Sequence, residues 1–354
     1  MSPQGLQRFG ALRTDAINAV SARFYADHSS IYARFGDKGR EACAEDLGFH
    51  LEFLRPVLEF GLLAPLVEYL HWLASVLEAR GVPTEHVAQS LDWLGEFFAA
   101  KLEPADAEVV VAALDAVKAK FLEQDDSLPE MYAKLPTAWP ERANFESALI
   151  AGDRRQAATI VGRYLDQGCG LVDTELHVIQ PALYGIGQQW QRNQVSVAQE
   201  HLATAIAQSV MVQGMLRSNP APSNGRKILL ACVEGNQHAV GLQMVADAFE
   251  IAGWEVNCLG ANVPTASLVL HAAQWKPNLV GLSISFPQQF KGVKSVISRM
   301  NDVIGAHRPP VIIGGMAINN FARLADRIGA NAWSPDAAAA VVSGTRIASP
   351  PGAD

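Results

Sequence analysis

Several features are scarce or missing in this sequence, and each absence excludes a class of protein. No run of eighteen apolar residues occurs, so we expect no membrane-spanning helix and no membrane partner. The first residues lack the apolar core of a signal peptide, which favours a cytoplasmic location. Only four cysteines are present, without the paired spacing of a zinc site. We expect free thiols, with Cys232 and Cys258 buried because both fall in runs that predict strands.

Basic residues are scarce in the N-terminal third of the chain. Residues 1–135 hold 12 Lys or Arg against 21 Asp or Glu, a net charge of −9, whereas the whole chain carries −8. A protein that binds nucleic acid needs a basic face for the phosphates. Because this region is acidic and no arm is rich in Lys or Arg, we do not expect nucleic acid as a partner.

Two polar, proline-containing stretches divide the chain into three parts. Residues 125–140 and 218–225 are turn-prone and lack periodic apolar positions, which is typical of linkers. We therefore expect domains over residues 1–126, 138–218 and 225–345.

Each part has its own pattern, and together they predict a multidomain α and α/β protein. Apolar stripes in the first part predict about six helices, which suits a globin-like all-α domain. Helical spacing in the second part predicts a four-helix cap bundle. In the third part, the apolar runs 227–233, 279–282 and 310–313 alternate with helical stretches. That alternation predicts a flavodoxin-like domain with a parallel sheet.

Residues with distinctive chemistry follow each of these three runs. His238 comes shortly after the first run, Ser283 directly after the second, and the pair Gly314-Gly315 directly after the third. The carboxyl ends of parallel strands meet at one edge, where open α/β folds bind ligands. An imidazole, hydroxyl groups and backbone free of side chains suit a large flat cofactor with a metal and a long polar tail.

The spacing of these residues resembles that of the cobalamin-binding module. Its pattern is Asp-x-His-x-x-Gly, about forty residues, Ser-x-Leu, just under thirty residues, and Gly-Gly. Here 41 residues separate Gly241 from Ser283, and 28 separate Ser285 from Gly314. The resemblance implies that His238 ligates cobalt from below and that the nucleotide tail is buried beside the sheet. It assigns to the cofactor Asn236, Gln237, His238, Gly241, Ser283, Ser285, Gly314 and Gly315.

The chain departs from that pattern at two places. The family has a carboxylate two residues before the histidine, and this chain has Asn236. We expect its amide oxygen to accept the hydrogen bond that orients the imidazole, but whether the exchange alters ligand switching stays open. Ser-Ile-Ser at residues 283–285 replaces Ser-x-Leu.

Other flavodoxin-like functions fit the same residues less well. In an ordinary domain of this class, His238 would only cap the first helix. A phospho-receiver would need an aspartate where Ser283 stands. Nucleotide binding would need a Gly-x-Gly-x-x-Gly or Walker motif after a strand, and neither occurs.

A second pattern lies in the middle part, where Trp190 is followed by nine residues and then Glu200-His201. With the module, residues 140–345 resemble the light-sensing, adenosylcobalamin-dependent transcription regulators. The resemblance implies that Trp190 packs beside the adenosyl group, that Glu200 contacts its ribose, and that His201 ligates cobalt after photolysis. The alternative is a tryptophan at a helix end and a solvated helix start. The DNA-binding winged helix of those regulators is missing here.

A globin-like domain before this cap and module resembles the photocobilins. That resemblance implies a bilin, biliverdin, in the N-terminal domain as a second chromophore. The alternative for each candidate contact is plain helix core or surface, and we do not expect Cys43 to attach a bilin covalently. The candidate bilin contacts are His50, Phe53, Arg55, His71 and Trp72.

The sequence thus predicts a photoreceptor and signalling protein rather than an enzyme. Light would break the cobalt–carbon bond, and the cap would move. The signal would pass through a homodimer or an unknown downstream protein, because only a short tail follows residue 345. A corrinoid carrier of methyl groups and a dark cobalamin sensor are the alternatives. The downstream partner, the oligomeric state and the bilin's identity and contacts stay open.

Overall fold

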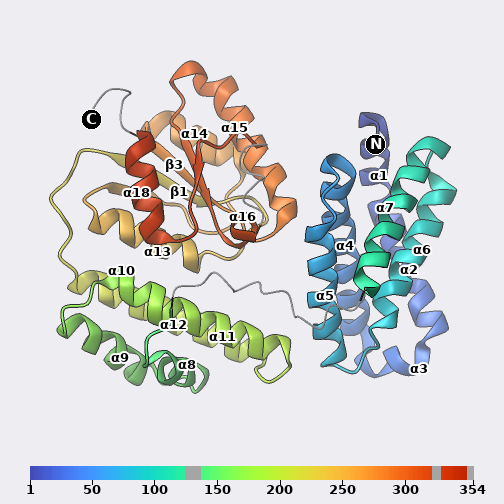
Figure 1. The fold of residues 1–354 in the computed structure, drawn as a ribbon, viewed down its shortest axis with the longest axis horizontal. Helices are drawn as coiled ribbons and strands as arrows, with labels where there is room; N and C mark the ends of the chain where they lie inside the picture. Colours follow the sequence, from blue (N-terminus) through green and yellow to red (C-terminus); the bar gives the residue numbers. More distant parts are fainter. Residues whose placement is uncertain (124–136, 321–327, 349–354) are drawn as a thin grey trace. The chain divides into compact units, whose positions relative to one another are not determined.

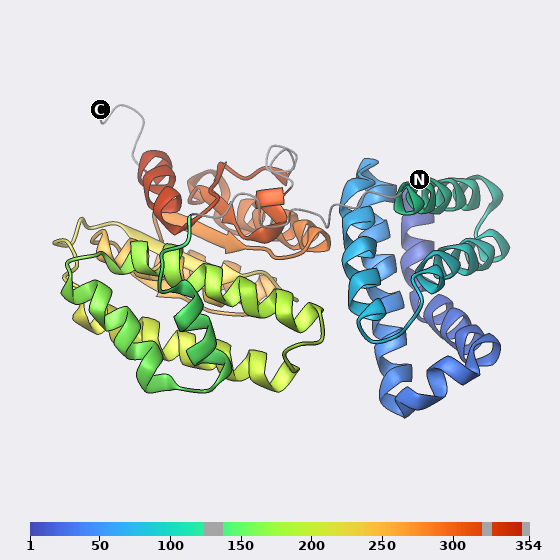
Figure 2. The ribbon, with the colours of Figure 1, turned by 60° about the horizontal axis from the view of Figure 1, so that its bottom comes forward.

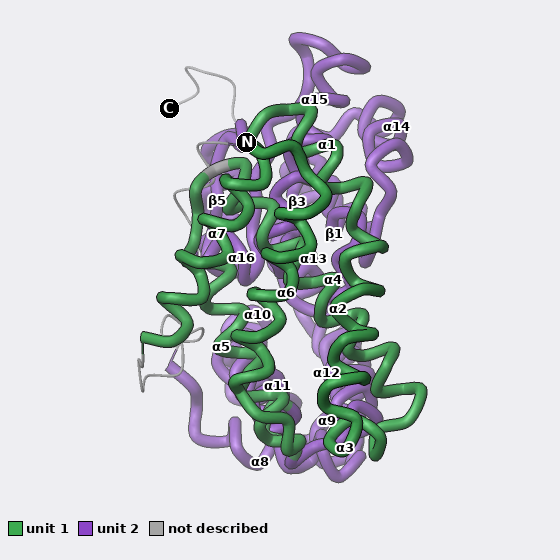
Figure 3. Tube along the Cα trace, turned by 90° about the vertical axis from the view of Figure 1, so that its right-hand side faces the viewer, with its two compact units in different colours: residues 1–130, 191–193 green, residues 131–190, 194–354 purple. Residues whose placement is uncertain are grey.

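The computed structural model describes residues 1–123, 137–320 and 328–348. The chain divides into two compact units, coloured separately in Figure 3. Unit 1 comprises residues 1–130 with 191–193, and unit 2 comprises residues 131–190 with 194–354. Within the described ranges, no helix is both long enough and apolar enough to cross a membrane.

Unit 1 is all helical where it is described, as its apolar stripes predict. On α4, Leu47, Leu51, Leu54 and Leu58 recur at helical spacing, and all four are buried. Gly61 ends α4 in the left-handed region at φ +70°, a conformation that glycine adopts without strain. The helices are α1 (Pro3–Ala11), α2 (Arg13–Asp27), α3 (Ser29–Tyr32), a 3₁₀ turn (Ala33–Phe35), α4 (Gly36–Phe60), α5 (Ala64–Glu78), α6 (Glu85–Lys101) and α7 (Pro104–Leu122).

Unit 2 begins with the helical cap. Its third predicted helix is continuous but changes its hydrogen-bond pattern, because Glu175–Ile179 form a π segment between α10 and α11. The last helix, α12, starts with a capping box in which Ser196 and Gln199 bond each other's backbone. The cap helices are α8 (Arg142–Ile150), α9 (Arg154–Asp166), α10 (Leu171–Thr174), α11 (Gln180–Gln191) and α12 (Val197–Arg217).

The rest of unit 2 is a five-stranded parallel sheet with helices on both faces (Figure 1). The strand order β2-β1-β3-β4-β5 is that of flavodoxin-like folds. The sequence does not predict β5, which has only two residues. The strands are β1 (Lys227–Cys232), β2 (Glu255–Cys258), β3 (Leu279–Ser283), β4 (Val311–Gly314) and β5 (Ala332–Trp333). The helices are α13 (Val240–Ile251), α14 (Thr265–Trp275), α15 (Phe290–Ile304), α16 (Met316–Asn320) and α18 (Ala337–Ala348).

The cap and the α/β domain share one apolar core. Figure 2 shows α11 and α12 lying along one side of the α/β domain. Leu176 and Ile179 of the π segment belong to the same buried cluster as Met244 and Ala248 of α13. The helix that follows β1 is therefore packed directly against the cap.

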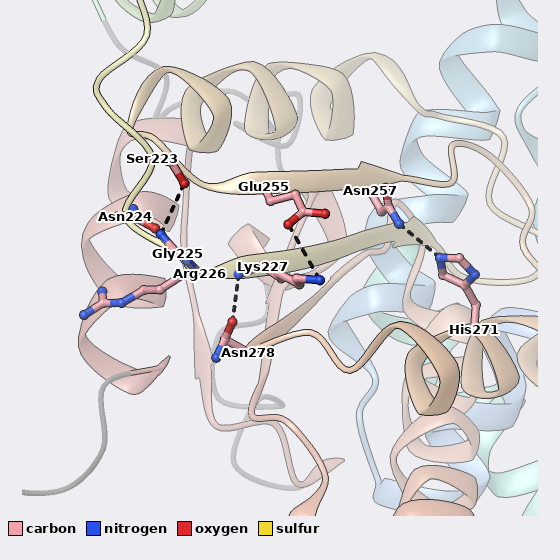
Figure 4. A network of polar contacts seen from close by, with 9 residues as sticks. All are labelled: Ser223, Asn224, Gly225, Arg226, Lys227, Glu255, Asn257, His271 and Asn278. Atoms are coloured by element: carbon pink, nitrogen blue, oxygen red, sulfur yellow. Dashed lines mark hydrogen bonds and ion pairs between the residues drawn. The ribbon is translucent and has the colours of Figure 1, made fainter.

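A polar network fixes the amino edge of the sheet (Figure 4). The backbone N–H of Lys227 donates to Oδ1 of Asn278 at 2.8 Å, and the Lys227 ammonium lies 3.7 Å from the carboxylate of Glu255. The contacts of Lys227 set the start of β1. Farther along β2, Asn257 and His271 of α14 are hydrogen bonded at 3.2 Å.

The expectation that both strand cysteines are buried is wrong for one of them. Cys232, in the inner strand β1, is fully buried. Cys258 is exposed, because it ends β2 at the edge of the sheet. Cys43 and Cys169 are half-buried, and all four thiols are free.

Candidate functional site

The strand register brings three distant segments together at the carboxyl edge of the sheet. Ser283, the last residue of β3, pairs with Cys232 of β1 on one side and with Gly314 of β4 on the other. Cys232, 51 positions before Ser283, and Gly314, 31 positions after it, are thus its immediate neighbours in the sheet. The edge that the sequence predicts from His238, Ser283 and Gly314 is continuous.

Asn236 is the centre of the loop that follows β1, and it is completely buried. Its Nδ2 donates to the backbone oxygen of Ser283 at 2.9 Å. Its Oδ1 accepts from the hydroxyl of Ser285 at 3.0 Å and from the backbone N–H of His238 at 3.1 Å. One amide side chain therefore ties the histidine loop to the end of β3.

This arrangement corrects the role expected for Asn236. The amide oxygen was expected to accept a hydrogen bond from the His238 ring, but it bonds the His238 backbone instead. The reason is geometric, since the loop folds back so that residue 236 faces β3. The imidazole lies edge-on to Phe286, with 5.3 Å between ring centroids.

His238 presents a neutral imidazole at this edge. The residue is exposed, as is its neighbour Gln237. Desolvation lowers the pKa of the His238 ring, and the nearby negative charge of Glu200 raises it by less. The ring is therefore unprotonated at neutral pH, which is the state in which a histidine ligates a metal.

Three glycines at the edge differ in the space and the backbone conformation that each position allows. Gly315 has φ +101°, and a Cβ there would overlap the backbone oxygen of Ile284, so the turn itself requires glycine. At Gly314 a Cβ would make only an ordinary contact, with the backbone of Ser334. At Gly241, on the first turn of α13, a Cβ would meet nothing within 4 Å. Gly241 therefore leaves open space beside the histidine loop.

The two serines differ in surroundings. Ser285 uses its hydroxyl to bond Asn236, so it supports the loop. The hydroxyl of Ser283 lies at the Cys232 thiol and favours its ionised form, yet burial dominates and raises the pKa of Cys232 to about 11. Both serines are half-buried at the edge.

Sequence reasoning missed two residues of this edge. Phe286 contacts the His238 ring. Gln289 is buried; its Oε1 accepts from the N–H groups of Ser285 and Phe286 at 2.8 and 3.1 Å, and its Nε2 donates to the oxygen of Gly235 at 3.1 Å. The only sequence signal that could have found them was their position, because Phe286 follows Ser-Ile-Ser directly and Gln289 lies three residues later.

The three cap residues lie at the facing ends of two helices. Trp190 is half-buried near the end of α11, and Glu200 and His201 lie in the first turns of α12. Oε2 of Glu200 lies 2.6 Å from Nδ1 of His201, and Oε1 accepts from the hydroxyl of Thr204 at 3.0 Å. His201 is exposed, and its Nε2 is the ring nitrogen that does not face Glu200.

In unit 1, three of the five candidate bilin contacts form a cluster. His50, Phe53 and Trp72 surround Tyr69, with ring centroids 5.6, 4.3 and 6.1 Å from the Tyr69 ring. Phe53 and Tyr69 are stacked within 11° of parallel. Helices α4 and α5 therefore carry a shared aromatic cluster.

The other two candidates each have a partner of their own. Arg55 is paired with Glu59, one turn along the same helix, at 2.7 Å. His71 packs against Phe121 of α7, with 5.0 Å between ring centroids.

A cavity of about 140 Å³ lies beside His50. Nδ1 of His50 donates to the backbone oxygen of Asp46 at 2.6 Å, and its Nε2 meets no hydrogen-bond partner in the described part of the chain. Burial lowers the pKa of His50 to about 4, so Nε2 is a bare acceptor. The cavity is lined in part by Phe24, Tyr32, Cys43, Asp46, His50 and Arg80.

Comparison with known proteins bears on unit 2. One B12 binding domain model matches residues 226–342, and a second B12 binding domain model matches residues 142–213. The first covers the sheet with the edge just described, and the second covers the cap.

Two relatives and one solved structure agree with these matches. The HTH-type transcriptional repressor CarA of Myxococcus xanthus is 26% identical over 232 residues, which is 64% of this chain and 76% of the repressor. Dimethylamine corrinoid protein 1 of Methanosarcina mazei is 26% identical over 149 residues, 41% of this chain and 68% of that protein. The monomethylamine corrinoid protein of Methanosarcina barkeri has the same fold, with a TM-score of 0.51 at 17% identity over 58% of this chain and 96% of that one. Residues 142–342 thus form a cobalamin-binding module.

Proposed function

We propose that this protein is a photoreceptor that binds adenosylcobalamin, with His238 as the lower ligand of cobalt. The observation that carries the proposal is the exposed His238 on the loop after β1, at the carboxyl edge of a sheet that matches a B12 binding domain. The cap matches a second B12 binding domain and packs on α13, the helix that follows the His238 loop. A cofactor ligated by His238 would therefore have the cap within reach.

The residues at the edge fit a corrinoid in their chemistry. The His238 imidazole is neutral and exposed, as a metal ligand must be. The open space at Gly241 would be lost to any larger side chain. Ser283 and the backbone of Gly314 and Gly315 would lie along the nucleotide tail.

When bound, adenosylcobalamin supplies a cobalt–carbon bond that visible light breaks. Trp190 would exclude water and shape the adenosyl pocket, and Glu200 would hold the ribose. His201 would supply an imidazole ligand to cobalt in the photoproduct. Oε2 of Glu200, 2.6 Å from Nδ1 of His201, would orient that ring.

We propose biliverdin as a second chromophore in unit 1. An engineered cavity of roughly 150 Å³ holds one benzene, so the cavity beside His50, at about 140 Å³, suits one ring of a bilin rather than the whole molecule. Nε2 of His50 would accept a hydrogen bond from a pyrrole N–H. The thiol of Cys43 is protonated, since burial raises its pKa to about 11, so covalent attachment is not part of the proposal.

The output would be a change of assembly rather than a reaction. We propose that displacement of the cap alters a homodimer or a contact with a downstream protein. Neither nucleic acid nor a membrane is a proposed partner.

A corrinoid carrier of methyl groups is the second candidate, because the chain is similar to a dimethylamine corrinoid protein over 149 residues. A carrier would need an open upper face and would be indifferent to light. A dark cobalamin sensor would share the binding and lack the photochemistry.

Absorption spectra of the purified holoprotein, before and after illumination, separate these functions. A photoreceptor should bleach irreversibly in its adenosyl form, and bound biliverdin should add a far-red band. The His201→Ala variant should keep the dark spectrum and lose the photoproduct with two imidazole ligands. His177→Gln is the matched control, because this second cap histidine stacks on Trp139. A light-inert adenosyl form, or methyl transfer to a thiol in the dark, would refute photosensing.

A further inference from the structure

Two buried carboxyl groups meet where the cap packs on the α/β domain. Glu175 is the first residue of the π segment and is completely buried. Asp247 lies in α13 and is 8% exposed. The two carboxyl groups are close enough to form a hydrogen bond with each other. Glu175 therefore comes from the cap, and Asp247 comes from the helix that follows the histidine loop.

Neither carboxylate is compensated by a cation. Both oxygens of Glu175 and Oδ2 of Asp247 lack a hydrogen-bond donor among the described residues. The nearby hydroxyl of Thr174 is committed, because it donates to the backbone oxygen of Gly170 at 2.9 Å. Two buried charges without a counter-ion would repel each other strongly. A single proton between the two groups removes the repulsion and supplies the missing donor.

The other ionisable groups around the pair do not neutralise it. Glu250, on α13, adds negative charge and raises the pKa of Asp247. Desolvation raises the pKa of the Cys258 thiol, at the end of β2, and the charge of Asp247 adds to that rise. No described Lys, Arg or His acts on either carboxyl group.

We propose that one proton shared by Glu175 and Asp247 fastens the cap to α13, and that loss of this proton loosens the cap. The contact depends on the proton because an ionised carboxylate can accept a hydrogen bond but cannot donate one. If both groups are ionised, neither can donate to the other. The π segment is where the loosening would begin, since its wide turn carries Glu175. The proposal concerns the protein itself and does not depend on light or on a second chromophore.

The ionisation of the pair agrees with one shared proton near neutrality. Burial and the charge of Asp247 raise the pKa of Glu175, and burial raises the pKa of Asp247. Both pKa values are above those of an unfolded chain, so the folded state binds extra protons and its stability falls as pH rises.

The test compares the full-length wild type with Glu175→Gln by hydrogen exchange of residues 171–191 and 240–251 from pH 6.5 to 9.5. A glutamine amide can donate to Asp247 at every pH. Opening of the wild-type contact releases one proton, whereas opening of the variant does not. We therefore expect the ratio of wild-type to variant exchange rates to rise with pH, by up to tenfold per pH unit. Asp173→Asn is the matched control, because this exposed carboxyl group lies two residues before Glu175 in the cap.

A ratio that stays constant over the whole pH range would overturn the proposal, since the contact would then be plain packing. If Glu175→Gln does not fold, Asp247→Asn serves instead, because an asparagine amide can donate to Glu175. Infrared difference spectra supply an independent measurement at pH 8. The wild type should show the C=O band of a protonated carboxyl group that both variants lack, and its absence would also overturn the proposal.

Discussion

The hydroxyl of Ser285 donates to Oδ1 of Asn236 at 3.0 Å, although the two residues are 49 positions apart. Asn236 also donates to the backbone of Ser283, so its amide uses both its acceptor and its donor. A carboxylate at this position could accept the first bond but could not make the second. The asparagine is therefore matched to the loop that it holds.

Replacing Asn236 with the aspartate of the family pattern should destabilise unit 2. Asn236→Asp removes the donor to Ser283 and buries a charge, which we expect to reduce the free energy of unfolding by about 1–3 kcal/mol. Burial should also raise the pKa of the new carboxyl group, so the loss should grow from pH 5 to pH 8. Urea denaturation at several pH values measures this. Gln237→Ala, an exposed neighbour, is the control. Equal stability of Asn236→Asp and wild type at pH 8 would contradict the account.

His238→Ala should abolish the cobalamin spectrum of an imidazole-ligated cobalt and leave the fold intact, because the ring is exposed and contacts Phe286 at one edge. The wild type should lose the same spectrum on acidification. Because desolvation lowers the pKa of His238, the ring of the apoprotein should protonate only below the ordinary pKa of a histidine, 6.5. An NMR titration of the apoprotein measures this midpoint, because bound cobalt would itself compete with the proton for the ring. An apoprotein midpoint above pH 6.5 would show that the ring is not desolvated.

Two glycines at the edge should respond in opposite ways to alanine. Gly315→Ala forces a Cβ onto the backbone of Ile284 at positive φ and should cost about 1–3 kcal/mol of stability. Gly241→Ala adds a methyl group in open space within a helix, which should stabilise the apoprotein by up to about 1 kcal/mol. If the cofactor occupies that space, Gly241→Ala should nonetheless weaken cobalamin binding. Thermal unfolding and cobalamin titration of both variants check this, and unchanged affinity of Gly241→Ala would place the corrin elsewhere.

Asp46 should make unit 1 less stable at alkaline pH. Burial raises the pKa of its carboxyl group to about 7, above the value of an unfolded chain. The stabilisation that its protonated form provides is full in acid and is lost as pH rises through 7. Asp46→Asn should therefore be more stable than wild type at pH 8.5, by about 1–2 kcal/mol. Denaturation followed in parallel with Glu41→Gln, an exposed carboxyl group on the same helix, tests this. A lower stability of Asp46→Asn at pH 8.5 would mean that its interaction with Arg80 outweighs burial.

The sequence predicts the coarse fold well, for a physical reason. Residues 227–233 and 279–282 are continuous apolar runs because strands inside a parallel sheet are covered on both faces. The same order of runs places His238, Ser283 and Gly314 on one edge, since every strand of such a sheet ends on the same side. The cobalamin-binding module is confirmed, whereas the roles of the individual residues and the bilin remain predictions.

The contacts within the site could not be predicted in the same way. Asn236 was assigned to the His238 ring because the pattern gives spacing and not the direction in which a loop folds. Glu175 and Asp247 are 72 positions apart on two amphipathic helices, where acidic residues are ordinarily solvated. Only the packing of the cap reveals that both are buried. Cys258 was expected to be buried because a sequence does not say which strand lies at the edge of the sheet.

The π segment sits near the start of a helical stretch that runs without a break from Leu171 to Gln191. Trp190 lies fifteen positions after Glu175 on that stretch, roughly 22 Å away at the rise of an α-helix. A rigid rod of this length turns a small change of pitch at one end into a larger sweep at the other. The position of the Trp190 indole would therefore respond to a change at Glu175 without direct contact between the two residues.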